Sequence, residues 1–247
     1  MKEPHVFILA AGSARRFNHR VKQMLPIGGE PMIRRTIRLI REVNPGIKIH
    51  VITWHNELKF NDVIVIDTKT QPDQMTDTML FSASWWSDRN IFLAGDVVFG
   101  KDTMQKILDY RTDEISMFYR DIYPTKDYAE RFAFRFTRAD IEVVSNLLKK
   151  SSRMFKGTTY EQDFGFTKVC YATHDERVLW LIAPIEYTDG THRYIPFIRS
   201  FRDFCIHHVY PFWKPRRIFT LIPVSDDITT DIDTLKEYEE FLALGVV

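Results

Sequence analysis

The sequence predicts an α/β protein of three layers, α/β/α, with a mostly parallel central sheet. The first observation is the continuous apolar run at residues 5–11, which is typical of a strand covered on both faces. The second is the order strand, helix, strand over residues 5–53, which has the spacing of a parallel βαβ unit. With 247 residues and 45% apolar side chains, the chain can bury a sizeable core, so we expect a globular protein.

The first predicted helix covers residues 31–43. Its apolar side chains recur every three or four residues from Ile33 onward, and Pro31 suits the first helical turn. The sequence Asn44-Pro45-Gly46 ends it. Three arginines share the opposite face, which is either a solvated surface or an anion-binding stripe: Arg34, Arg38 and Arg41.

The remaining elements are predicted from apolar periodicity and from turn residues between the apolar segments. Further strands are expected at residues 47–53, 63–67, 91–94, 114–120, 131–137, 166–172 and 217–224. Further helices are expected at residues 78–86, 101–110, 139–150, 175–182, 194–204 and from 235 onward. No repeat and no Pro/Gly/Ser-rich linker separates these segments, so residues 1–247 are expected to form a single domain.

Charge and composition exclude several classes of protein. The chain has 34 basic and 33 acidic residues, a formal net charge of +1, so no broad field favours nucleic acid or an anionic membrane. No apolar run reaches the roughly 18 residues that span a bilayer. Cys170 and Cys205 form no C-x-x-C pattern and are expected to be buried free thiols. These features predict a cytoplasmic protein without nucleic-acid or membrane partners.

Residues 6–26 are interpreted as a strand that leads into a nucleotide-binding loop. Gly12 allows the backbone to turn sharply and to approach a ligand closely. Arg15 and Arg16 add the forked cations that suit phosphate oxygens. The loop matches neither G-x-G-x-x-G nor G-x-x-x-x-G-K-[ST], and taken alone it is also compatible with an ordinary strand-to-helix connection.

Three spaced segments together resemble the signature of the nucleotidyltransferases of the GT-A-like α/β fold. They read LAAGSARRF at residues 9–17, KQMLP at residues 22–26 and GEPMI at residues 29–33. That superfamily includes the sugar-phosphate, methylerythritol-phosphate and molybdenum-cofactor nucleotidyltransferases, and the second segment is closest in wording to the cytidylyltransferases. The resemblance implies the transfer of an NMP group from an NTP to a phosphorylated acceptor, such as a sugar or polyol phosphate, with release of pyrophosphate.

The resemblance also implies roles for individual residues. Arg16 and Lys22 take the places of the signature arginine and lysine, which contact the triphosphate and are implied as catalytic. Ala14 stands where a second glycine is usual, which implies either a displaced loop or a divergent nucleotide preference. The loop residues implied in nucleotide binding are Leu9, Ala10, Ala11, Gly12, Ser13, Ala14 and Arg15. Thr78 and Ser82 fall where the family reads the base and ribose, although helix caps and helix-surface residues have the same appearance.

Two aspartates are implied as ligands of Mg²⁺ or Mn²⁺. Asp96 follows an apolar strand and a glycine, as does the metal-binding aspartate of the family; the alternative is that it caps the helix predicted at residues 101–110. Asp233 resembles a second ligand found in some branches, and the alternative is again a helix cap. Thr234 and Glu237 form a capping-box pattern, which would leave Asp233 free to point elsewhere.

The resemblance divides the single domain by role. Residues 1–111 are the nucleotide-binding half, residues 112–224 the acceptor-binding half, and residues 225–247 a C-terminal metal-ligand loop and helix. Candidate acceptor contacts, which an exposed basic face explains equally, are Asp163-Phe164-Gly165, Lys168, His192-Arg193 and Lys214-Pro215-Arg216-Arg217. The expected partners are a nucleoside triphosphate and a small phosphorylated acceptor, and a homo-oligomer is left open.

Two other functions are alternatives to this prediction. A glycosyltransferase of the related fold would use a nucleotide-sugar donor, typically with an Asp-x-Asp motif after the fourth strand. That place reads Asp96-Val97-Val98 here, which counts against the alternative. The second alternative is a non-catalytic nucleotide-binding relative, for which the alanine at position 14 leaves room.

Overall fold

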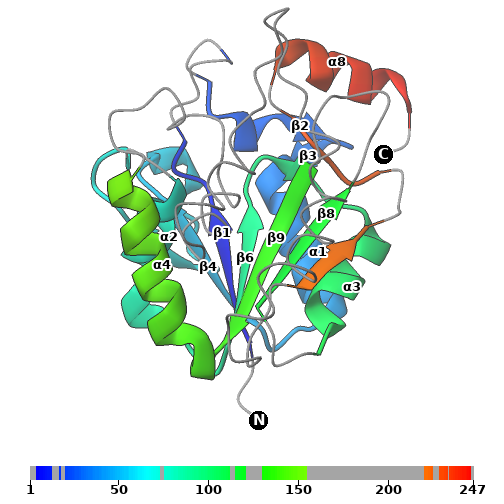
Figure 1. Cartoon of the computed structure of the whole chain (residues 1–247). Coiled ribbons are helices and arrows are strands. Elements are labelled where there is room, and N and C mark those ends of the chain that lie inside the picture. The colour runs from blue at the N-terminus through cyan, green and yellow to red at the C-terminus, as the bar shows by residue number, and fades with distance from the viewer. Residues whose placement is uncertain are drawn as a thin grey trace, which may run out of the picture.

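The computed structural model describes residues 4–12, 17, 20–72, 75–111, 115–120, 130–154, 220–224, 228–232 and 234–245. Their centre is a seven-stranded sheet in the order β10-β8-β9-β6-β1-β4-β5 (Figure 1). The strands are β1 (His5–Leu9), β4 (Lys48–Thr53), β5 (Ile64–Asp67), β6 (Arg89–Ala94), β8 (Ser116–Arg120), β9 (Glu130–Thr137) and β10 (Thr220–Pro223). Only β9 runs against the others in this sheet, so the predicted mostly parallel sheet is confirmed.

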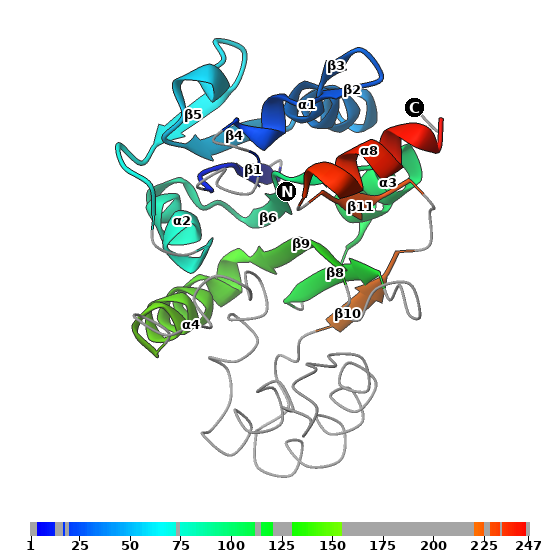
Figure 2. The ribbon, with the colours of Figure 1, turned by 90° about the horizontal axis from the view of Figure 1, so that it is seen from above.

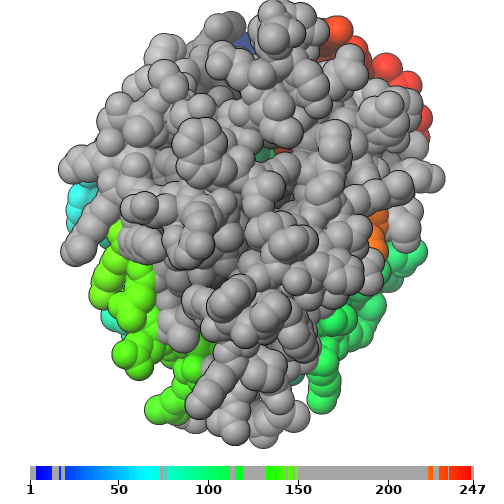
Figure 3. All heavy atoms as spheres, in the orientation of Figure 1, coloured from blue at the N-terminus to red at the C-terminus, as the bar shows by residue number. Residues whose placement is uncertain are grey.

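Helices cover both faces of the sheet, as the three-layer prediction requires. Figure 2 shows α1 (Met32–Val43) and α3 (Lys101–Asp109) on one face, and α2 (Met75–Phe81) and α4 (Ile141–Met154) on the other. In the space-filling view, α4 and α3 accordingly lie at opposite edges of the molecule (Figure 3). No helix in the described part of the chain is both long and apolar enough to cross a membrane.

Most predicted elements lie within two residues of their observed bounds, and two helices differ. Of the strand predicted at residues 217–224, the structure describes β10 from Thr220 to Pro223, and residues 217–219 lie outside the described residues. The helix predicted at residues 78–86 is α2, which begins at Met75 and ends at Phe81, followed by the short 3-10 helix η4 (Ala83–Trp85). The helix predicted at residues 139–150 continues to Met154 as α4, after the 3-10 turn η5 (Arg138–Asp140). The strand predicted at residues 166–172 and the helices predicted at 175–182 and 194–204 lie outside the described residues.

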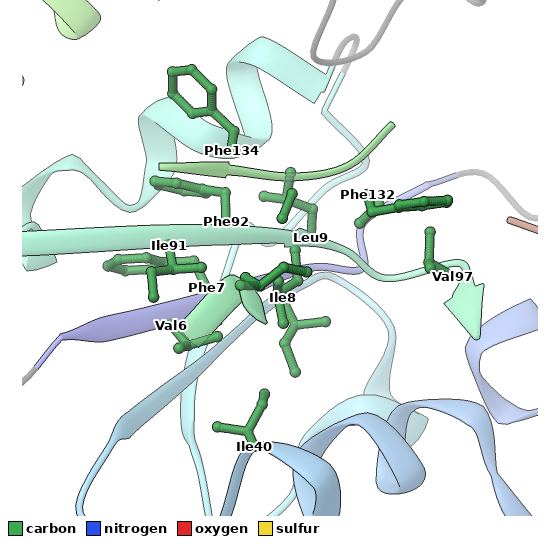
Figure 4. Close-up of a cluster of buried hydrophobic side chains, with 14 of the residues drawn as sticks. Val6, Phe7, Ile8, Leu9, Ile40, Ile91, Phe92, Val97, Phe132 and Phe134 are labelled. Carbon is green, nitrogen blue, oxygen red and sulfur yellow. The ribbon is translucent and has the colours of Figure 1, made fainter. Parts of the chain in front are cut away.

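The core forms around β1, because apolar side chains on both of its faces meet other elements. Phe7 stacks on Phe92 of β6 with a centroid separation of 4.7 Å, and Ile40 of α1 approaches from one side of the sheet (Figure 4). Val6, Phe7 and Ile8 are completely buried. The continuous apolar run therefore reflects burial on both faces, as expected for an interior parallel strand.

The arginine face of α1 is a solvated surface of ion pairs. Arg34 and Arg41 both contact the carboxylate of Asp62, each at 2.7 Å. Arg38 contacts Glu30 at 2.7 Å, and Glu42 on the same helix at 2.6 Å. Because every one of these cations has a carboxylate partner, the structure favours the solvated face over the anion-binding stripe.

A second, smaller apolar cluster attaches the C-terminal segment to the N-terminal half. The segment consists of β11 (Thr230–Asp231) and α8 (Leu235–Ala243), and β11 pairs with β7 (Val97–Val98), which follows β6. The buried members of the cluster are Phe17, Ile27, Met32, Val98, Ile232, Tyr238 and Phe241. This packing places residues 228–245 beside the turn that follows residue 22.

Candidate active site

The carboxyl ends of β1, β4 and β6 meet at one edge of the sheet. The register pairs Leu9 with both Ile52 and Ala94, so the segments that leave these strands start at the same level. The carbonyl of Leu9 accepts a hydrogen bond from the N–H of Gly95 at 3.0 Å, and the N–H of Ala10 donates to Ile52 at 3.0 Å. Ligands of open α/β sheets bind at such an edge.

Gly95 is required by the close approach of two strand ends. A Cβ at this position would lie 2.3 Å from the carbonyl oxygen of Leu9 and 3.0 Å from its carbonyl carbon. Any other residue would push β6 away from β1, because the contacting atoms belong to the backbone. The glycine therefore places Asp96, the next residue, beside the loop that follows β1.

Lys22 and Asp96 form an ion pair in this region. Lys22 begins the 3-10 helix η2 (Lys22–Met24), and its Nζ lies 2.6 Å from Oδ2 of Asp96. The two side chains are 14% and 28% exposed, so the pair is accessible to a ligand and still partly screened from water. Nζ also lies 3.4 Å from the carbonyl oxygen of Ile232.

A tight hairpin fixes the chain that follows Lys22. Strands β2 (Pro26–Ile27) and β3 (Glu30–Pro31) pair across two glycines with φ of 60° and 85°, a left-handed conformation that glycine adopts without strain. The N–H of Met32 then donates to the carbonyl of Leu25 at 2.9 Å, where α1 begins. The K-x-x-L-P and G-x-P segments therefore build one rigid turn that carries the lysine.

The C-terminal segment closes the site from the other side. The N–H of Ile232 donates to the carbonyl of Asp96 at 3.0 Å, while the carbonyl of Ile232 faces Lys22. The hydroxyl of Tyr238 donates to the carbonyl of Pro26 at 2.8 Å. One residue of the C-terminal segment, Ile232, thus contacts Asp96 through its N–H and Lys22 through its carbonyl, an arrangement that the sequence did not predict.

The helix caps exclude one alternative for Asp96. The N-cap of α3 is Gly100, which makes no side-chain cap, so Asp96 does not cap that helix. Thr234 caps α8 through the predicted capping box with Glu237, with hydrogen bonds of 3.2 and 2.8 Å. Asp233 itself lies outside the described residues.

Two aromatic residues that the sequence did not indicate as functional contact the loop after β1. Trp54 and His55 directly follow β4; the indole N–H of Trp54 donates to the carbonyl of Ala11 at 3.1 Å. Nε2 of His55 lies 2.8 Å from the carbonyl oxygen of Gly12. The only available signal was their position immediately after a buried strand.

Of the remaining predicted site residues, two are buried in the fold and the others lie outside the described residues. Ser82 is completely buried; its hydroxyl donates to the carbonyl of Met79 at 2.6 Å and accepts from the indole N–H of Trp86 at 2.9 Å. Because the fold already uses this hydroxyl, we leave Ser82 out of the candidate site. Thr78 is also buried, with 5% exposure, and is not a helix-surface residue. Outside the described residues lie Ser13, Ala14, Arg15, Arg16 and the candidate acceptor contacts at residues 163–165, 168, 192–193 and 214–217.

The donor set at Asp96 fits a hard cation. Mg²⁺ commonly uses only one or two protein carboxylates, completed by phosphate oxygens and water. Asp96 offers such a carboxylate, partly exposed at the ligand-binding edge of the sheet. The described residues contain no cluster of three or more His, Cys, Asp or Glu side chains that would hold a metal by themselves.

A comparison with protein families decides the identity of the domain. Residues 6–154 match the family model described as the MobA-like NTP transferase domain. The chain belongs to this family. Its members are nucleotidyltransferases, and the prediction of a nucleotidyltransferase is confirmed. A search of curated protein sequences found no match.

Several solved structures named as nucleotidyltransferases are similar in fold to this MobA-like chain, at low sequence identity. The CTP:phosphocholine cytidylyltransferase of Streptococcus pneumoniae is 13% identical, with a TM-score of 0.58 over 98% of this chain and 99% of that one. A nucleotidyl transferase from Methanothermobacter has 13% identity and a TM-score of 0.55 over 99% and 100% of the two chains. The inositol-1-phosphate CTP transferase of T. maritima has 12% identity and a TM-score of 0.52 over 97% and 94%. These likenesses confirm the predicted GT-A-like fold.

Proposed function

We propose that the protein moves an NMP group from a nucleoside triphosphate to a small phosphate monoester and releases pyrophosphate. The observation that carries the proposal is the ion pair of Lys22 and Asp96, with 2.6 Å between Nζ and Oδ2, at the carboxyl edge of the sheet. A cation and a carboxylate at one place are what a metal-bound triphosphate needs. The family membership supports the same class of reaction.

Lys22 is proposed to exchange its carboxylate partner for phosphate oxygens when the nucleotide binds. Its charge then offsets the negative charge that develops on the leaving pyrophosphate. Arg16 is proposed to assist, and the loop from Leu9 to Arg15 is proposed to surround the phosphates. Asp96 and Asp233 would hold Mg²⁺ or Mn²⁺, which when bound neutralises charge on the phosphate oxygens.

The proposed reaction is a single displacement. An oxygen of the acceptor phosphate attacks the α-phosphorus of the nucleotide and forms the new P–O bond. The bond between the α-phosphorus and the oxygen that bridges to the β-phosphorus breaks, and its electron pair leaves with pyrophosphate. The site residues act by holding the two reactants in line and by charge stabilisation, without a covalent enzyme intermediate.

The nature of the acceptor is proposed from the neighbours in fold. Phosphocholine and inositol 1-phosphate, named for two of them, are small polar alcohols that carry one phosphate. Both neighbours are also named for CTP, and the KQMLP segment resembles the cytidylyltransferases. CTP with a phosphorylated polyol or amino alcohol is therefore the first pair of substrates to test.

The test is a pyrophosphate-release assay with each of the four NTPs against a panel of phosphorylated sugars, polyols and amino alcohols, with and without Mg²⁺. We expect release with one NTP and one acceptor, and none above background for Asp96→Ala. Asp62→Ala is the matched control, because it removes an exposed carboxylate that pairs only with α1 arginines among the contacts described above. Near-normal turnover of Asp96→Ala, or hydrolysis of nucleotide-sugars alone, would contradict the proposal.

A further inference from the structure

Trp54 and His55 bind two successive carbonyl groups of the loop after β1. The indole N–H of Trp54 donates to Ala11 at 3.1 Å, and the imidazole of His55 is 2.8 Å from the oxygen of Gly12. A carbonyl oxygen only accepts hydrogen bonds, so Nε2 of His55 carries the proton and donates. Both contacts cross from β4 to β1 and connect residues that are 43 positions apart.

The two aromatic side chains are themselves held in place. His55 is 8% exposed, and its backbone N–H donates to the hydroxyl of Thr53 at 3.0 Å. The rings of Trp54 and His55 lie in contact, with 4.3 Å between their centroids. Because these contacts restrict both donor side chains, the carbonyl groups that the donors bind have little freedom to turn.

Fixing these carbonyls also fixes the direction of a peptide N–H. In a trans peptide the C=O and N–H bonds point in opposite directions. The bond from Trp54 to Ala11 therefore directs the N–H of Gly12 away from Trp54. Among the described residues, and apart from the two chain neighbours, no heavy atom lies within 4 Å of the position that a Cβ on Gly12 would occupy, so these residues do not crowd the turn at Gly12.

We propose that Trp54 and His55 are positioning residues for nucleotide binding, which keep the carbonyls of Ala11 and Gly12 turned away from the triphosphate. The inference rests on the proposed function. A carbonyl oxygen that turned toward the phosphates would repel them, whereas an N–H in the same place attracts them. Holding the turn in one orientation before the nucleotide arrives lowers the cost of ordering it.

The test compares variants that remove one donor with a variant that restores it. Trp54→Phe keeps the aromatic contact and loses the N–H, and His55→Leu removes the second donor. His55→Gln places an amide N–H near the position of Nε2. Calorimetric titration with each of the four NTPs and Mg²⁺, in the absence of acceptor, gives Kd, and thermal unfolding of each variant gives Tm.

We expect Trp54→Phe and His55→Leu each to raise Kd for the NTP that the wild type uses by roughly 3- to 10-fold, the loss of one hydrogen bond. His55→Gln is expected to stay within about twofold of the wild type. In the pyrophosphate assay, KM for the NTP rises in the same two variants, while kcat changes little. The double variant is expected to lose less than the product of the single effects, because both donors orient one turn.

Trp86→Phe is the matched control. It also removes an indole hydrogen bond, 2.9 Å to Ser82, but at the amino end of β6. We expect it to lower Tm and leave Kd unchanged. If Trp54→Phe and His55→Leu also lower Tm and leave Kd unchanged, the positioning role is wrong and the proposed function stands. If His55→Leu does not fold, Trp54→Phe decides alone. If the wild type binds none of the four NTPs, the proposed function and this inference both fall.

Discussion

Lys22 contacts both a carboxylate and a backbone carbonyl of the candidate site, and it is the cation that the proposed reaction depends on most directly. We expect Lys22→Ala to lower kcat/KM for pyrophosphate release by about 10²- to 10³-fold, since one charge-stabilising donor is lost. Lys106→Ala is the control, because Lys106 donates to a backbone carbonyl, that of Pro223, at 2.6 Å on α3. A loss of equal size in both variants would argue against a specific role for Lys22.

Gly95 and Gly12 make a contrasting pair of loop glycines. Gly95→Ala puts a methyl group 2.3 Å from the Leu9 oxygen, so a strand end must shift. We expect the free energy of unfolding to fall by about 1–3 kcal/mol, together with a loss of activity. Gly12→Ala meets no atom of the described residues within 4 Å, apart from its chain neighbours, and its stability should stay within about 0.5 kcal/mol of the wild type. Chemical denaturation of both variants checks this, and a wild-type value for Gly95→Ala would refute it.

At the scale of elements, α8 and β11 pack against the turn that carries Lys22, and we call these two elements the clasp. Tyr238 is 9% exposed, packs in the second cluster and donates to Pro26 at 2.8 Å. Its ring packs in the apolar cluster, and its hydroxyl forms the hydrogen bond to the turn. The two roles can be separated by a substitution that keeps the ring.

Tyr238→Phe is expected to lower the free energy of unfolding by about 1 kcal/mol, the net value of one hydrogen bond. The amide of Ile232 should exchange its hydrogen faster, because the clasp opens more often. Hydrogen–deuterium exchange measures this directly. Lys236→Ala is the control on the same helix, since the Lys236 side chain is 83% exposed and pairs with Glu240 of that helix at 3.5 Å. Unchanged exchange at Ile232 in Tyr238→Phe would show that the hydroxyl does not hold the clasp.

Some parts of the candidate site could be predicted from sequence because they lie in single short segments, and other parts could not because they depend on contacts between elements. The loop after β1, Lys22 and Asp96 were found because each lies in a short segment whose spacing is characteristic by itself. Trp54, His55 and Ile232 act through contacts between residues far apart in the chain, and nothing in their local sequence marks those contacts. The hydroxyl of Ser82 bonds to the carbonyl of Met79 and to the indole of Trp86, a use that helical periodicity does not distinguish from a ligand contact.

At the scale of the whole molecule, the alternation of strands and helices was predicted well, because the spacing of apolar residues reflects which positions of each strand or helix are buried. The reversed direction of β9 was not predicted. Burial sets the apolar pattern of a strand, whereas its direction depends on the path of the connecting chain, which apolar periodicity does not record.

The stability of the whole fold should depend on pH through His50. This side chain of β4 is completely buried and stacks on Phe7 of β1; burial above all, then His5 and Lys48, lower its pKa to about 4. Unfolding restores an ordinary pKa of 6.5, so the unfolded chain binds the extra proton between these two values. Stability is therefore complete above pH 6.5 and is lost as the pH falls toward 4.

We expect the free energy of unfolding to fall by roughly 2 kcal/mol from pH 7 to pH 5 because of His50. Burial also lowers the pKa of His5, which lies 3.2 Å from His50, so the measured loss will include a contribution from both rings. Urea denaturation at the two pH values measures the difference. His50→Leu should reduce the loss, and an equal loss in that variant would assign the pH dependence to other groups.

The contact of Ile232 with Lys22 spans 210 positions of the chain. During synthesis at about 5–20 residues per second, Ile232 is added roughly 10 to 40 seconds after Lys22. Lys22 and Asp96 are both present well before that time, and Ile232, the residue that contacts both of them, is added later. A nascent chain on the ribosome can therefore form the sheet edge and the ion pair, but it lacks the clasp until the segment at residues 228–245 has emerged.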